Sequence, residues 1–240
     1  YVDAVSIREW LGEALPYDRR HKIVDPDALA FVLLARLSPG EQMLPDGELD
    51  RRRAHLRDQY RARLQDATVA DPIEPLVMRV NAGDCVRVEL ANRLPAFLPD
   101  EPGDALMPKI VPLNVDPSST GETSETNVRP SSYVTLHPQL VSYNVASHNG
   151  AATGYNGETP IGPGQRTRSY WYAGTVTREG DRLVHTGAEL LPANLTSWGD
   201  IINHGPHGLV GALITEPTGA TYHDPLSGSQ VSNGGTSVII

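Results

Sequence analysis

The chain has 240 residues, 39% of them hydrophobic and 20% charged, a balance typical of a globular protein with a substantial core. A net charge of −9 argues against a general nucleic-acid-binding role, because a phosphate-binding surface needs a positive field. The single cysteine excludes an internal disulfide framework and a thiolate zinc cluster, and no run of about 20 apolar residues offers a membrane span.

The first 70 residues are predicted to form an N-terminal extension or linker with two short helices, near Ser6–Leu15 and Gly47–Leu64. In the second helix, leucines and a tyrosine recur on one face and arginines cover the other. That basic face either binds an acidic partner or packs, partly solvated, on the acidic protein itself, which is the interpretation that we favour. Residues 28–34 form an apolar run that is either a buried strand or a helical turn, and periodicity does not decide between them.

From residue 71 onward, short apolar or alternating segments are punctuated by Gly and Pro, which predicts a mainly β Greek-key barrel or sandwich. The predicted strands are 75–80, 85–90, 133–136, 139–145, 167–172 and 208–215. Residues 96–131 are predicted to be a long loop or insertion. We place the β domain at 71–220 and expect 221–240 to be a linker or the start of a following strand, with an ordinary edge strand as the alternative.

Three segments carry a resemblance to a known family. Residues 75–95 combine an apolar strand, the turn Gly83-Asp84 and an alternating strand that ends in Asn92-Arg93-Leu94. Residues 136–165 contain His137, an Asn-Gly turn and a Pro-Gly turn, and residues 200–217 end in Gly-Leu-x-Gly-Ala-Leu-Ile-x-Glu-Pro. Together these segments resemble the cupredoxin domains of multicopper oxidases, most closely those of the large multi-domain bacterial enzymes that include manganese oxidases. The resemblance implies a cupredoxin-like Greek-key fold.

The resemblance also implies copper in the complete enzyme, bound by a Cys–His set and by His-x-His pairs. His137 matches the first position of one pair, but Gln139 stands at the second, and the other pair falls where this chain has Trp198 to Asp200. Cys85 lies in the alternating strand far from any histidine, so we expect it to point into the protein as a small apolar residue. The copper sites are therefore expected to be degraded in this chain.

Four histidines remain as candidate metal ligands: His137, His204, His207 and His148. The spacing His204-x-x-His207, with Asp200 four residues before it, suits one metal ion at a turn, and His148 and His185 lie in loops from which they could join it. The alternative is that these imidazoles simply hydrogen-bond the backbone. Walker, dinucleotide-binding and Gly-x-Ser-x-Gly patterns are absent from the sequence, and no residue is assigned as catalytic.

The leading hypothesis is a domain or fragment of a secreted, periplasmic or cell-surface multicopper oxidase. The resemblance implies oxidation of a metal ion or small reductant coupled to reduction of O₂, with this chain inactive alone and packed against other cupredoxin domains or chains. The alternative is a non-catalytic module that binds Cu, Mn or Zn, or that serves assembly, through its loop histidines. A third hypothesis is a proteolytic half of one enzyme that pairs with its other half.

Overall fold

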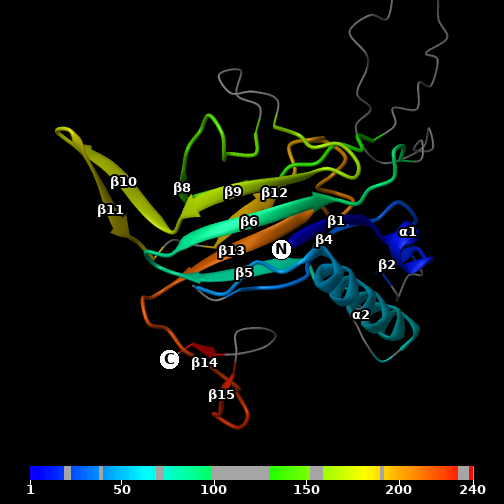
Figure 1. Ribbon diagram of the computed structural model, residues 1–240. Helices are drawn as coiled ribbons and strands as arrows, with labels where there is room; N and C mark the ends of the chain where they lie inside the picture. Colours follow the sequence, from blue (N-terminus) through cyan, green and yellow to red (C-terminus); the bar gives the residue numbers. More distant parts are fainter. Residues whose placement is uncertain are drawn as a thin grey trace, which may run out of the picture.

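The fold is built on two stacked β-sheets (Figure 1). The computed structural model describes residues 1–18, 23–37, 40–66, 68, 73–98, 130–151, 159–189, 192–231 and 238–239. The first sheet has the order β4-β1-β6-β9-β8 and the second the order β5-β13-β12-β7. Three small sheets lie outside this pair: β10-β11, β2-β3 and β15-β14-β16.

The helices and strands follow one another along the chain with these bounds: β1 Val2–Ser6, α1 Ile7–Leu11, β2 Leu15–Asp18, β3 Ile23–Asp25, β4 Leu29–Leu33, α2 Asp46–Gln65, β5 Leu76–Asn81, β6 Cys85–Asn92, β7 His137–Pro138, β8 Ser142–Tyr143, β9 Arg166–Tyr172, β10 Gly174–Glu179, β11 Arg182–Gly187, β12 Ala193–Thr196, β13 Val210–Glu216, β14 Tyr222–His223, β15 Gln230–Val231 and β16 Val238–Ile239.

The chain crosses repeatedly between the two sheets, which confirms the mainly β Greek-key prediction and selects the sandwich over the closed barrel. β5 in one sheet is followed by β6 in the other, and β9 is followed across the hairpin β10–β11 by β12 in the second sheet. Two pairings are parallel, β1 with β6 and β5 with β13, and the others within the two sheets are antiparallel.

The main core fills the space between the sheets. Alternate residues of each strand point inward, as in Leu76, Met78 and Val80 of β5, which are buried between more exposed neighbours. Trp171, Leu195 and Leu213 are among the largest fully buried side chains of this cluster. A second apolar cluster, which includes Val5, Ala30, Val32 and Leu49, lies between β1, β4 and the helices.

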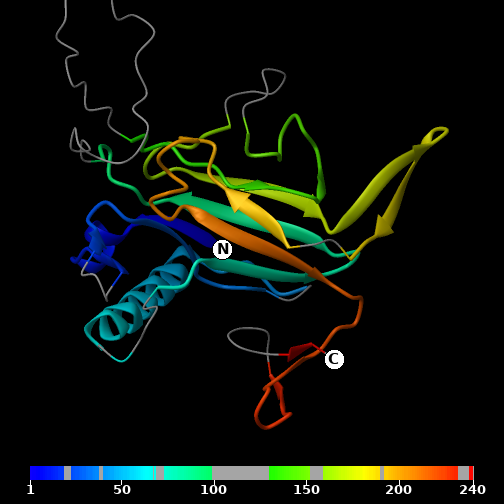
Figure 2. The same cartoon turned by 180° about the vertical axis from the view of Figure 1, so that it is seen from behind.

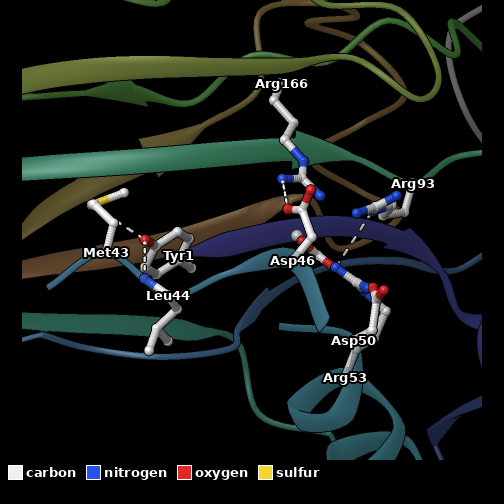
Figure 3. A network of polar contacts seen from close by, with 9 residues as sticks. Tyr1, Met43, Leu44, Asp46, Asp50, Arg53, Arg93 and Arg166 are labelled. Carbon is white, nitrogen blue, oxygen red and sulfur yellow. Dashed lines mark hydrogen bonds and ion pairs between the residues drawn. The ribbon is translucent and has the colours of Figure 1, made fainter. Parts of the chain in front are cut away.

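Residues 1–70, expected as an extension with short helices, contain both helices and also supply β1 and β4 to the first sheet. The undecided segment 28–34 is the strand β4, whose residues Leu29 and Phe31 face the main core while Ala30 and Val32 face the second cluster. The basic face of α2 is paired within the protein. Arg53 donates to the buried carboxylate of Asp3 at 2.5 Å, and Arg166 pairs with Asp46 at the start of the helix (Figure 3).

Some expectations for individual strands are wrong. Segment 133–136 makes only a single bridge, Val134 with Ile161, and of 139–145 only Ser142–Tyr143 is a strand. Cys85 is exposed rather than inward, because Val86, Val88 and Leu90 take the inward positions of β6. The predicted loop 96–131 lies mostly outside the described residues.

Two appendages extend from the sandwich. The hairpin β10–β11, which the sequence reasoning missed, projects away from the two sheets (Figure 2). The C-terminal strands β14 to β16 are tied to the sandwich by Tyr222, which donates a hydrogen bond to the buried carboxylate of Glu216. Arg79 also pairs with Glu216, at 2.7 Å, and its guanidinium lies 5.0 Å from the centre of the Tyr222 ring.

Among the described residues, no helix is both long and apolar enough to cross a lipid bilayer.

Candidate functional site

The two segments that carry the His-x-His resemblance meet at one end of the sandwich. β7 pairs with β12 in the register His137 opposite Thr196, which places Trp198 beside the imidazole. The ring centroids of His137 and Trp198 are 5.3 Å apart at an interplanar angle of 60°. His137 also makes an edge contact with Tyr143, with ring centroids 6.1 Å apart. We call His137, Tyr143 and Trp198 the aromatic cluster.

A tight turn fixes the orientation of the His137 ring. Its Nδ1 hydrogen-bonds the carbonyl oxygen of Asn149, and because a carbonyl only accepts, Nδ1 carries the proton. Gly150 follows with φ of 67°, and a Cβ there would come within 2.4 Å of the Leu136 carbonyl oxygen, so only glycine fits. Nε2 of His137 therefore keeps its lone pair and is the ring nitrogen that can accept a hydrogen bond or bind a metal.

Neither neighbour of His137 supplies a second imidazole. Gln139 is exposed, and the Trp198 indole N–H donates to the hydroxyl of Thr196 at 3.2 Å. An indole nitrogen has no lone pair to offer a metal. Gly199 is pressed against the chain at Tyr133, where a Cβ would lie 1.8 Å from the carbonyl oxygen, so this junction is closely packed.

His204 is fully buried and both of its ring nitrogens are engaged. Nε2 donates to the carbonyl of Ser131 at 2.6 Å, so Nδ1 is the acceptor for the hydroxyl of Ser197 at 2.8 Å. Burial lowers the pKa of this imidazole below its ordinary value, although the Ser131 carbonyl and the Asp200 charge oppose the shift. Because both nitrogens of this neutral ring are in hydrogen bonds, neither is free to coordinate a metal ion.

Asp200 organises the turn before His204 rather than facing a metal ion. Its carboxylate accepts from the backbone N–H groups of Ile202, Asn203 and Ser131 at 2.9–3.1 Å, and from the Asn203 side chain at 2.9 Å. Burial alone would raise the pKa of Asp200, but these hydrogen bonds outweigh it and the pKa is lowered.

The other histidines lie in separate environments. His207 pairs through Nδ1 with Asp25 at 3.0 Å, and its carbonyl accepts from Leu29, which ties the loop to β4. His148 makes an edge contact with Tyr170 at 5.3 Å and has a buried Nδ1 with no hydrogen-bond partner among the described residues. His185 on β11 contacts Tyr172 at 5.1 Å.

The residues present do not fit a copper centre. Within the described part of the chain, no group of three or more His, Cys, Asp or Glu side chains is placed to hold a metal ion. His137 offers a single nitrogen and contacts two aromatic rings, and Cys85 lies on the outward face of β6 with Arg87 and Glu89. Sequence reasoning named His137 and Trp198 but missed Tyr143, because a two-residue strand leaves no periodic pattern to detect.

Comparison with known proteins finds similarity among solved structures but none by sequence. No family model matches the chain, and no curated protein matches it by sequence. Among solved structures, the chain is similar to a multi-copper oxidase from Pseudomonas thermotolerans, with a TM-score of 0.37 and 12% identity. The match covers 91% of this chain and 30% of that one, so the chain spans less than a third of its length.

Proposed function

We propose that this chain is a cupredoxin-like domain of a multicopper oxidase in which the aromatic cluster replaces a copper-binding pair. The observation that carries the proposal is the meeting of His137 and Trp198, 5.3 Å apart, from the two segments that resemble the family's copper-binding stretches. Where the family has facing imidazoles, this chain has one imidazole, an indole and a phenol. The complete enzyme would oxidise a metal ion or small reductant and reduce O₂ at copper held elsewhere.

In this proposal the chain serves as a scaffold that packs against copper-bearing domains or chains outside the cytoplasm. Exposed apolar residues near the aromatic cluster support that role: Tyr133 is 52% exposed, Trp198 44% and Ile201 69%. Aromatic side chains that keep this much exposed surface are enriched where proteins contact one another.

Copper content tests the proposal. The isolated chain, incubated with excess Cu²⁺ and dialysed, is expected to retain far less than one copper per chain and to show no blue absorbance. Restoring imidazoles through the double variant Gln139→His and Trp198→His is expected to raise copper retention, with the same pair plus His137→Ala as its control. Stoichiometric copper in the unmodified chain, lost in His137→Ala, would overturn the proposal.

A metal-binding or assembly module without redox chemistry is the second candidate. The contact between His207 and Asp25 favours it, since an imidazole beside a carboxylate forms half of many metal sites. Titration with Zn²⁺ tests it. Micromolar binding that disappears in His207→Ala would support this candidate, and unchanged affinity in that variant would exclude it.

A further inference from the structure

A cavity of about 240 Å³ opens between β6, β9 and the loops that follow β8. Its floor is the inner face of β6 and β9, and its roof is formed by residues around Thr135, Ala146 to Gly150, and Thr159 to Ile161. The cavity exists because β9 places two small residues inward. Thr167 and Ser169 stand opposite Leu90 and Val88, where a filled core would have large apolar side chains.

The lining is apolar on one side and hydroxylic on the other. Val88, Leu90 and Trp171 supply the apolar surface, and Ser147, Thr159, Thr167 and Ser169 supply hydroxyl groups. The indole N–H of Trp171 is already donated to the His148 carbonyl at 3.0 Å, so this ring is held in place and offers the cavity only apolar surface. Among the residues that the structure describes, none with a charged side chain lines the cavity.

One polar atom in the lining lacks a partner. The hydroxyl oxygen of Thr159 is buried without a hydrogen bond to any described residue. Leaving a buried donor unpaired is unfavourable, so a bound molecule that pairs with this hydroxyl would be stabilised by it. The volume lies just below the range of about 300–1,000 Å³ typical of drug-sized ligands, so the molecule is a smaller one.

We propose that this cavity binds a small neutral molecule that has an apolar ring or chain and a hydroxyl or carbonyl group. The apolar part lies against Trp171, Val88 and Leu90, and the polar group bonds the hydroxyl of Thr159. An anion is disfavoured, because burying a carboxylate where no cation can pair with it costs far more than the contact returns. The site is independent of copper and of the proposed function.

Benzyl alcohol and benzoate are a matched pair of probes, since they share a ring and differ in charge. We expect benzyl alcohol to shift the indole N–H resonance of Trp171 saturably in NMR titrations, with the resonance assigned through Trp171→Phe. Benzoate is expected to bind at least about tenfold more weakly, from the cost of desolvating its charge. Equal binding of the two probes would overturn the proposal.

Substitutions in the cavity lining test whether benzyl alcohol binds there. Thr159→Val keeps the side-chain shape and removes one hydrogen bond, so the dissociation constant of benzyl alcohol is expected to rise about two- to tenfold. Thr175→Val, on the exposed strand β10, is the matched control and should leave it unchanged. Ser169→Leu fills the cavity and should abolish binding. Should that variant fail to fold, Thr159→Val decides alone: unchanged affinity there, or a crystal structure of the soaked protein with only water in the cavity, overturns the proposal.

Discussion

His204 shows how a histidine that looks like a ligand in the sequence becomes a buried structural residue. Its neutral ring joins Ser131 to Ser197, and burial keeps the pKa below the ordinary value of 6.5. As the pH falls below about 6.5, the unfolded chain takes up a proton at this position that the folded chain does not. The free energy of unfolding should therefore decrease with falling pH, and its loss is complete only below the folded-state pKa.

Urea denaturation at pH 7.5 and 5.5 measures this effect. The His204→Gln variant, which removes the titrating group, is expected to lose less stability between the two pH values than the unmodified protein. His55→Gln, on the exposed face of α2, should retain the full pH dependence. An identical pH dependence in His204→Gln would show that other groups are responsible.

Tyr222 makes the opposite prediction at high pH. Burial and the Glu216 carboxylate raise the pKa of Tyr222 to about 12. Because the folded chain holds this proton more tightly than the unfolded one, the stabilisation is complete below about pH 10 and is lost as the pH rises toward 12. Tyr222→Phe should show a smaller loss of stability between pH 9 and 11 by thermal denaturation, and a loss equal to that of the unmodified protein would contradict the assignment.

At the scale of elements, α2 is held to the sandwich by a buried ion pair. The Asp3 side chain is 3% exposed and pairs with Arg53 at 2.5 Å, with Arg93 farther away at 3.9 Å. Arg53→Ala leaves this carboxylate incompletely paired, and we expect it to lower the free energy of unfolding by about 3 kcal/mol. Arg51→Ala removes an exposed pair with Glu48 and should change stability by less than about 1 kcal/mol. Equal effects of the two variants in urea denaturation would refute the docking role.

The elements also show where sequence patterns succeed. The helices near Ser6–Leu15 and Gly47–Leu64 were predicted, as were β5, β6, β9 and β13, because each has a clear period or an alternation between one buried and one exposed face. β4 could not be assigned because it is covered on both faces and reads as an unbroken apolar run. β7 and β8 have two residues each, too few for any period.

The residues of the candidate site could be predicted in part, but their contacts could not. The family resemblance predicted that Gln139 and Trp198 stand where imidazoles would be, and in the structure the register of β7 with β12 brings Trp198 to His137. The hydrogen bonds that occupy His204 and His207 come from Ser131 and Asp25, distant in the chain. Such tertiary contacts leave no trace in local spacing, so sequence alone could not decide between a ligand and a structural histidine.

At the scale of the whole molecule, the two apolar clusters share strands β1 and β4. The helix α2 therefore cannot separate from the sandwich without exposing residues of β4, and we expect a single unfolding transition. Far-ultraviolet circular dichroism, sensitive to α2, and tryptophan fluorescence, sensitive to Trp171, should give coincident urea curves. Separate midpoints would show that the N-terminal elements unfold as an independent unit.

The main core should dominate the stability of the whole chain. Leu195 is fully buried between the sheets, and Leu195→Ala is expected to cost about 2–5 kcal/mol in the free energy of unfolding. Leu183 at the projecting hairpin is 66% exposed, and Leu183→Ala should cost less than about 1 kcal/mol. Comparable losses in the two variants would contradict the placement of the core.

The close packing of Gly199 on the Tyr133 carbonyl restricts what protein engineering can achieve at this end of the sandwich. A side chain of any size at position 199 would displace the neighbouring backbone, and Asp200 is committed to holding the following turn. Of three consecutive positions, only 198 is open to a new function. A designer who wishes to add a metal ligand within residues 198 to 200 must therefore use position 198.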